Sequence, residues 1–176
     1  MYLRKLELKD APLMLAWMHD KSVTENMRTD FTSKTLQDVE NFIMWSLEDK
    51  ENLNLAIASD EDEYMGTVSL KHIENGSAEF AITVRAEAMG RGYSWFGMES
   101  IIEKAFHELG LESIYWCVSC ENIRAIRFYD KHNFHEALDI PHKVLDRYKD
   151  IENLKWYLIL KGDEFILNDS QQYKLI

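Results

Sequence analysis

The sequence predicts a mixed α/β (α+β) domain, because apolar residues alternate with polar ones in some segments and recur every three to four residues in others. Asn75-Gly76 stands between two alternating segments and is a strong β-hairpin signal, since both turn residues must tolerate a positive φ. We therefore expect a mixed, mostly antiparallel central sheet of about seven strands, flanked by about four helices. The expected strands are residues 2–8, 53–58, 64–73, 78–84, 113–118, 134–138 and 154–160.

Helix signals separate these strands. Asp10 is a candidate N-cap for a first helix, and a polar loop, 21–32, precedes the second. The third helix follows the loop 85–92 and has the clearest apolar stripe. That stripe contains Met98, Ile101, Ile102, Ala105, Phe106 and Leu109. A fourth helix can begin at Asn122 and extend to His132.

The chain has 176 residues, a length typical of one domain. We expect a single domain over 1–176, with a core at about 1–162 and a tail at 163–176. The 31 acidic and 20 basic residues give a net charge of −11, which argues against a nucleic-acid partner. The acidic charge suits a cationic small molecule, although from charge alone it is more simply interpreted as keeping the protein in solution. We find neither a signal peptide nor a run of about 18 apolar residues, so we expect a cytoplasmic protein without a membrane partner.

One candidate binding segment is Met89-Gly90-Arg91-Gly92-Tyr93-Ser94, between a predicted strand and the clearest helix. Glycine lets a ligand approach the backbone, and the N–H groups at a helix N-terminus attract an anion such as a pyrophosphate. The spacing matches neither GxxxxGK[ST] nor GxGxxG. Considered alone, the segment is more simply interpreted as an ordinary strand-to-helix turn.

A second candidate segment runs from Asn122 to Phe134. Asn122 stands at a strand end, and Ala125 and Tyr129 share one face of the following helix. The small Ala125 leaves room for a ligand, and the Tyr129 hydroxyl is a candidate proton donor. Taken alone, Tyr129 is more often a packed aromatic residue.

Together, in this order and separated by one helix and one strand, the two segments resemble the GCN5-related N-acetyltransferase (GNAT) superfamily. The similarity is greatest to the branch that acetylates ribosomal-protein alanine, spermidine and nucleotide-sugar amines, and it covers roughly residues 1–160. In the family's first motif, Met89 replaces Arg or Gln and Ser94 replaces Gly or Ala. The second motif, Asn-x-x-Ala-x-x-x-Tyr-x-x-x-Gly-Phe, is matched at Asn122, Ala125, Tyr129 and Phe134.

The resemblance implies the GNAT fold, in which two parallel strands, here 78–84 and 113–119, splay apart and hold acetyl-CoA in the cleft between them. The exposed backbone of a splayed strand can pair with pantetheine. The residues implied to contact the cofactor are Ile82, Thr83, Val84, Met89, Gly90, Arg91, Gly92, Tyr93, Ser94, Trp95, Asn122, Ala125 and Tyr129.

The implied reaction is direct attack of a primary amine on acetyl-CoA in a ternary complex. Tyr129 would donate a proton to the leaving thiolate, and Glu79, on the first splayed strand, would be the base. The alternative for Glu79 is a solvated strand position. The amine is a polyamine, a peptide N-terminus or an amino sugar, which the sequence does not distinguish. The residues expected to contact it are Glu25, Asn26, Met27 and Trp116.

Two other functions remain as alternatives. A non-catalytic acyl-CoA sensor on the same fold would explain the departures at Met89 and Ser94. A metal or redox role would use Cys117 and Cys120, but the zinc-finger spacing is poor and we expect no metal. The expected partners are a small-molecule or peptide amine and, as an open possibility, a second copy of the chain in a homodimer.

Overall fold

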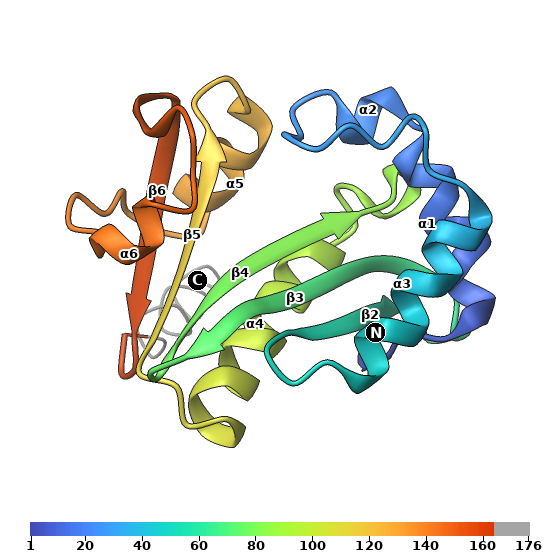
Figure 1. Cartoon of the computed structure of the whole chain (residues 1–176), viewed down its shortest axis with the longest axis horizontal. Coiled ribbons are helices and arrows are strands. Elements are labelled where there is room, and N and C mark those ends of the chain that lie inside the picture. Colours follow the sequence, from blue (N-terminus) through green and yellow to red (C-terminus); the bar gives the residue numbers. More distant parts are fainter. Residues whose placement is uncertain (164–176) are drawn as a thin grey trace, which may run out of the picture.

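A computed structural model describes residues 1–163, and six strands of these residues form one sheet (Figure 1). The strands are β1 (Tyr2–Lys5), β2 (Leu53–Ala58), β3 (Tyr64–Glu74), β4 (Ser77–Val84), β5 (Ser113–Ser119) and β6 (Leu154–Leu160). They lie in sequence order, and every neighbouring pair is antiparallel except β4 and β5, which are parallel. The mixed α/β class and the mostly antiparallel sheet are therefore confirmed.

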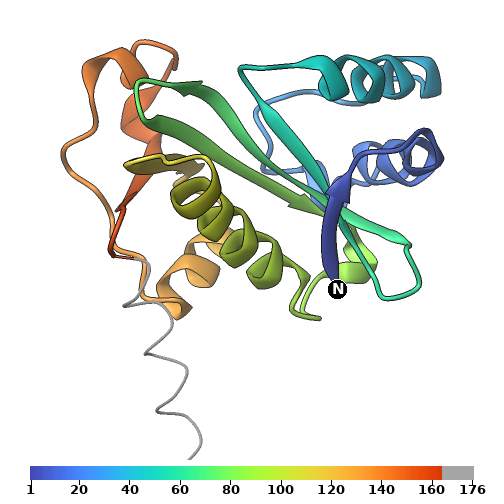
Figure 2. The ribbon, with the colours of Figure 1, turned by 90° about the horizontal axis from the view of Figure 1, so that it is seen from below.

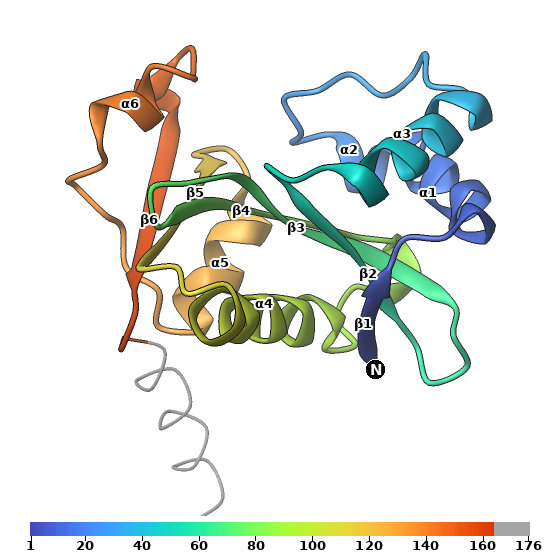
Figure 3. The ribbon, with the colours of Figure 1, turned by 60° about the horizontal axis from the view of Figure 1, so that its bottom comes forward.

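Helices cover both faces of the sheet. They are α1 (Ala11–Met18), α2 (Lys21–Thr24), α3 (Leu36–Glu48), α4 (Tyr93–Glu103), α5 (Ile123–Lys131) and α6 (His142–Leu145). Figure 3 shows α1 and α3 on one side of the sheet and α4 and α5 on the other. Figure 2, from below, shows α4 lying across the strands. None of these helices is long and apolar enough to cross a membrane.

Alternation along the strands explains these two layers. Ala78 and Phe80 on β4 are buried in one apolar cluster with the α4 residues Met98 and Ile101. A second cluster joins α1 and α3 to the other side of the sheet. The Asn75-Gly76 hairpin is confirmed, with φ of 50° and 75° at its two turn residues.

β4 and β5 separate after a short paired segment. They pair only at Ser77↔Ser113, Ala78↔Ile114 and Glu79↔Tyr115, whereas β4 stays paired to β3 as far as Val84. Beyond Glu79 the facing edges of β4 and β5 diverge (Figure 1). Strand edges have backbone groups that need hydrogen-bond partners, so the divergence creates a site for an extended ligand.

Several predicted elements were wrong in detail. The expected seventh strand, 134–138, makes only an isolated bridge between Glu136 and Tyr157. The loop 21–32 contains the four-residue α2, and α6 was not predicted. The apolar stripe is buried as expected except at Leu109, because a π-helical turn, Lys104–Glu108, ends that helix and leaves Leu109 exposed. The predicted tail lies outside the described residues, apart from Asp163.

The first strand ends at Lys5, not at residue 8, because Asp10 draws the chain into a turn. Asp10 is 1% exposed and accepts two hydrogen bonds from the Arg4 guanidinium, both of 2.7 Å, and one from the Glu7 N–H. Its side chain therefore does not cap α1, although it stands at the N-cap position. Pairing with Arg4 compensates the burial of this carboxylate.

Candidate active site

A cleft of about 830 Å³ opens where β4 and β5 diverge, and we call it the β4–β5 cleft. Its walls come from the 21–32 loop, β4, the 89–94 loop, β5, α5 and the segment 147–148 after α6. Most residues singled out from the sequence line it, and these are Asn26, Met27, Glu79, Ile82, Thr83, Val84, Met89, Gly90, Ser94, Trp116, Asn122, Ala125 and Tyr129. Two motifs distant in sequence thus share one cavity.

The 89–94 loop ends in a helix N-terminus. Gly90 and Gly92 have φ of 73° and 89°, a region that glycine enters without strain, and Gly92 is the N-cap of α4. Five backbone N–H groups of the loop and the first turn of α4 have no hydrogen-bond acceptor within residues 1–163. They belong to Gly90, Gly92, Tyr93, Ser94 and Trp95. These unpaired donors, together with the open space around Gly90, fit an anionic group such as a pyrophosphate.

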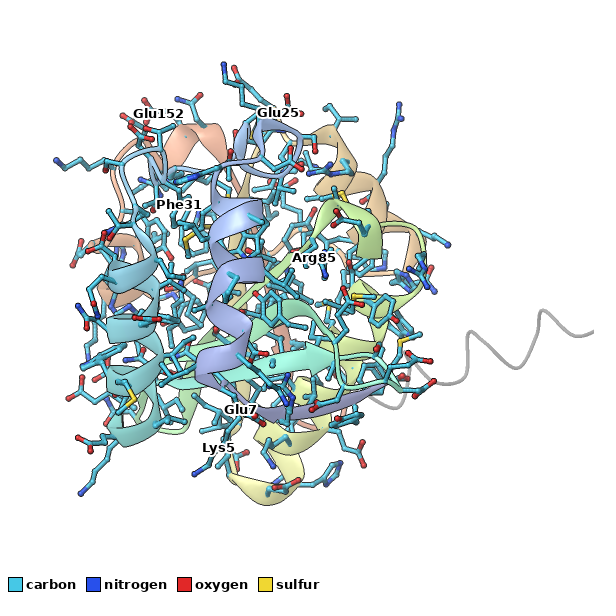
Figure 4. All side chains as sticks on the ribbon, turned by 90° about the vertical axis from the view of Figure 1, so that its right-hand side faces the viewer. Lys5, Glu7, Glu25, Phe31, Arg85 and Glu152 are labelled. Carbon is cyan, nitrogen blue, oxygen red and sulfur yellow. The ribbon has the colours of Figure 1, made fainter. Side chains whose placement is uncertain are left out.

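Five predicted contact residues are not part of the cleft lining. Glu25 is exposed on the outer side of the 21–32 loop (Figure 4). Trp95 instead stacks on His132 with ring centroids 3.8 Å apart, which ties α4 to α5. Tyr93 is buried in the core, and the Arg91 guanidinium lies 5.7 Å from its ring. The fifth is Gly92, which could contribute only its backbone N–H.

Tyr129 is positioned by the cap of α5. The Asn122 side chain accepts a hydrogen bond of 3.1 Å from the Ala125 N–H, which confirms Asn122 as the cap. Tyr129 then lies against Trp116 and Tyr157, at centroid distances of 5.4 Å and 4.8 Å, and is 7% exposed. Burial raises the pKa of the Tyr129 hydroxyl well above its usual value, so the hydroxyl remains protonated and can act as a donor.

Glu79 faces the other side of the cleft, at the last paired position of β4 and β5. The Tyr148 hydroxyl donates a hydrogen bond to its Oε1 atom. Burial, followed by this bond, raises the pKa of Tyr148. Sequence analysis missed Tyr148, because it lies 69 positions from Glu79 and belongs to no motif. The Glu79 carboxylate is thus fixed in the cleft lining by a hydrogen bond, and it is not a freely solvated strand side chain.

The 21–32 loop bridges the mouth of the cleft. Arg28 donates a 3.2 Å hydrogen bond from Nη2 to the Lys149 carbonyl, and its guanidinium lies 5.0 Å from the Tyr148 ring centroid. From the opposite wall, Arg124 donates a 3.1 Å bond from Nη1 to the Ser22 carbonyl. These contacts hold the loop over the point where β4 and β5 separate.

Cys117 lines the cleft beside Glu79 and Tyr148 but is not an activated nucleophile. Burial, and then the Glu79 side chain, raise the pKa of the Cys117 thiol to about 11. Because the thiolate is the reactive form, iodoacetamide at pH 8 should alkylate Cys117 about 100-fold more slowly than an ordinary thiol of pKa about 8.5. The exposed Cys120 is the internal comparison.

Peptide mass spectrometry over a time course measures both alkylation rates. The Cys117 rate should keep rising with pH up to about 11, since its thiolate fraction is small below that pKa. Equal rates at the two cysteines at pH 8 would contradict the buried environment assigned to Cys117.

Comparison with known proteins identifies the family of this chain. A family model described as an acetyltransferase (GNAT) domain matches residues 1–135. The chain belongs to the GNAT acetyltransferase family. It is 31% identical over 137 residues to the uncharacterized N-acetyltransferase p20 of Bacillus licheniformis, a match that spans 75% of this chain and 77% of that protein.

Solved GNAT structures have the same fold. A spermidine N-acetyltransferase from Vibrio cholerae in complex with CoA and spermine superposes with a TM-score of 0.77 at 20% identity, over 93% of this chain and 97% of that one. A second structure of a spermidine/spermine N-acetyltransferase from this organism, with manganese ions, gives 0.69 at 23% identity, over 96% of each chain. The GNAT chain described here is an N-acetyltransferase, and its cofactor is acetyl-CoA.

Proposed function

We propose that this GNAT protein transfers the acetyl group of acetyl-CoA to a primary amine by direct attack within a ternary complex. The observation that carries the proposal is the placement of Glu79 and Tyr129 in the lining of one cleft, which also includes Gly90 and Ser94 of the 89–94 loop. A base, a hydrogen-bond donor to the leaving sulfur and an anion-binding backbone are the parts that such a transfer needs.

The unpaired N–H groups of residues 90 and 92–95 would hold the pyrophosphate, and the free edge of β4 at Ile82–Val84 would pair with pantetheine. When bound, acetyl-CoA supplies an activated acetyl group as a thioester. The chain is strongly acidic, so its overall field does not favour this polyanion. Donors close to the phosphates, namely the loop backbone and Arg124 beside it, would therefore provide the binding.

Glu79 would receive the proton that the acceptor loses. An alkyl ammonium has a pKa of about 10.4, so at neutral pH the acceptor needs a base before it can attack. The Tyr148 hydroxyl fixes Oε1 of Glu79, which orients the carboxylate at the edge of the cleft. The proton would move from the amine nitrogen to the carboxylate, directly or through one water.

Tyr129 would stabilise the departing sulfur from its hydroxyl. Its pKa is raised, whereas a thiol has a pKa of about 8.5, so complete proton transfer from Tyr129 to the thiolate is unfavourable. We therefore assign Tyr129 a hydrogen bond to the sulfur as negative charge develops there. Hydrogen bonds to charged groups contribute about 1.5–3 kcal/mol, which corresponds to about 10- to 100-fold in rate.

Thiol release from acetyl-CoA across a panel of primary amines tests this function. We expect turnover with at least one amine, and Tyr129→Phe should lower kcat about 10- to 100-fold with little change in the affinity for acetyl-CoA. Unchanged kcat in the variant would remove Tyr129 from the mechanism. If acetyl-CoA raises the melting temperature but no amine gives turnover, the chain is an acyl-CoA sensor.

A further inference from the structure

The charge of the β4–β5 cleft is opposite in sign to that of the chain. Its lining contains one carboxylate, Glu79, and four side chains with a permanent positive charge. These four are Arg28, Lys71, Arg124 and Arg147. The whole chain, by contrast, has a net charge of −11. A ligand in the cleft responds mainly to these nearby charges, because salt screens more distant ones.

Two of the four cations are already engaged. Arg147 pairs with Glu74 and donates a 2.6 Å hydrogen bond to the Tyr115 hydroxyl. Arg124 lies next to the 89–94 loop, where its Nη1 atom is 3.2 Å from the Met89 sulfur. It therefore belongs to the cofactor end of the cleft.

Arg28 and Lys71 have no carboxylate partner among residues 1–163. Arg28 uses one N–H for the Lys149 carbonyl, which leaves most of its five donors available. Lys71 lies directly across from Glu79 in the β3–β4 register, so both side chains project from the same face of the sheet. Both cations also lower the pKa of the Cys117 thiol, which places them near the same part of β5.

These two cations flank the assigned base from different elements. Lys71 is its neighbour on β3, and Arg28 lies over the ring of Tyr148, whose hydroxyl donates to Glu79. A polyamine would bring further positive charges close to both. An amine that also carries an acidic group would place its nitrogen at Glu79 and its negative charge between Arg28 and Lys71.

We propose that the acceptor is an amine bearing a carboxylate or phosphate, and that Arg28 and Lys71 bind this acidic group. The inference rests on the proposed amine transfer at the same cleft. In this inference the two cations select the acceptor, whereas the 89–94 loop binds the cofactor and Glu79 accepts the proton. The inference also opposes the preference for a cationic acceptor that the net charge alone suggests.

A second cavity indicates which probe to use. A pocket of about 290 Å³ lies between α1, α3 and the sheet. It shares five lining residues with the cleft, namely Phe31, Lys71, Ala81, Ile82 and Thr83. Its apolar walls are formed by Met14, Trp17, Met18, Phe31, Val39, Phe42 and Ile82. An apolar group next to the amine can therefore be accommodated, and L-phenylalanine is a suitable carboxylate probe.

Calorimetric titration of the CoA-loaded protein tests the proposal without turnover. The probes are L-phenylalanine against L-phenylalaninamide, O-phosphoethanolamine against ethanolamine, and spermidine. We expect the acidic member of at least one pair to bind at least tenfold tighter than its counterpart without the acidic group and than spermidine. The pair that shows the difference identifies carboxylate or phosphate as the acidic group.

Variants that remove the charge of Arg28 or Lys71 test whether these two residues bind the acidic group of the probe. Arg28→Gln and Lys71→Gln should each weaken binding of the acidic probe about tenfold and should not weaken binding of its counterpart without the acidic group. Lys21→Gln is the matched control, since Lys21 is exposed on α2 and outside the cleft lining. It should change neither affinity.

The outcomes separate this inference from the proposed function. If an acidic amine binds selectively but gives no thiol release from acetyl-CoA, the transfer reaction is wrong and the specificity assignment stands. If spermidine or the probes without the acidic group bind equally well, or no acidic amine binds, the assignment is overturned whatever the turnover.

Discussion

Replacing Glu79 with Gln is expected to lower kcat by about 10²- to 10³-fold at pH 7, with acetyl-CoA affinity unchanged. The amide of Gln has nearly the shape of the carboxylate, and its oxygen can still accept the hydrogen bond from Tyr148. It cannot take the proton of an ammonium. The substitution therefore removes the base while preserving the local geometry, and steady-state kinetics with the best acceptor measures the loss.

The pH dependence distinguishes a lost base from a structural defect. As pH rises towards about 10, the acceptor loses its proton to solvent and no longer needs Glu79. The difference between Glu79→Gln and the unmodified protein should therefore shrink with increasing pH. Glu112→Gln is the control, because Glu112 is exposed and outside the cleft lining. A loss below threefold, or one that is constant from pH 7 to 10, would exclude Glu79 as the base.

Replacing Gly66 with Ala is expected to reduce the free energy of unfolding by about 3 kcal/mol. A methyl group on Gly66 would lie 2.5 Å from the Thr83 carbonyl oxygen and 2.9 Å from the Val84 Cα. Both atoms belong to the β4 backbone, which cannot move away without breaking its pairing with β3. Because this end of β4 lines the cleft, acetyl-CoA binding should weaken as well.

Gly97→Ala is the matched control. A methyl group there would also be too close to its neighbours, but these are the ends of the Ile57 and Ile82 side chains, which can rotate. Alanine also favours a helix by up to about 1 kcal/mol over glycine. We expect a loss of less than about 1 kcal/mol, measured by urea denaturation. Equal losses in the two variants would mean that the β4 backbone at Thr83 and Val84 moves aside as easily as the Ile57 and Ile82 side chains.

Contiguous sequence signals predicted the fold well. Positive φ at Asn75 and Gly76, and capping of α5 by Asn122, depend on residues next to one another in the chain, so both could be inferred locally. The seventh strand failed because alternation at 134–138 does not supply a pairing partner. Asp10 failed as a cap because Arg4 and the Glu7 N–H compete for its carboxylate.

The sequence predicted which segments form the site, but it did not predict all the side chains that line the cleft. The 21–32 loop was expected near the acceptor, and Asn26 and Met27 line the cleft, whereas Glu25 faces outwards. Loop residues have no fixed periodicity, so the sequence did not indicate which of them face inwards. For the same reason Arg28 was not predicted as a cleft residue. Its hydrogen-bond partner, the Lys149 carbonyl, is 121 positions away in the sequence.

The sequence by itself determined the order of the six strands and of α1, α3, α4 and α5, the Gly90–Gly92 turn and the position of Tyr129 on its helix, because each depends on neighbours a few residues apart. The tertiary structure alone decided the Glu79–Tyr148 contact and the placement of Arg28 and Lys71 around it. Net charge is a property of the whole chain, whereas a bound ligand responds to the few charges within reach, and folding decides which those are.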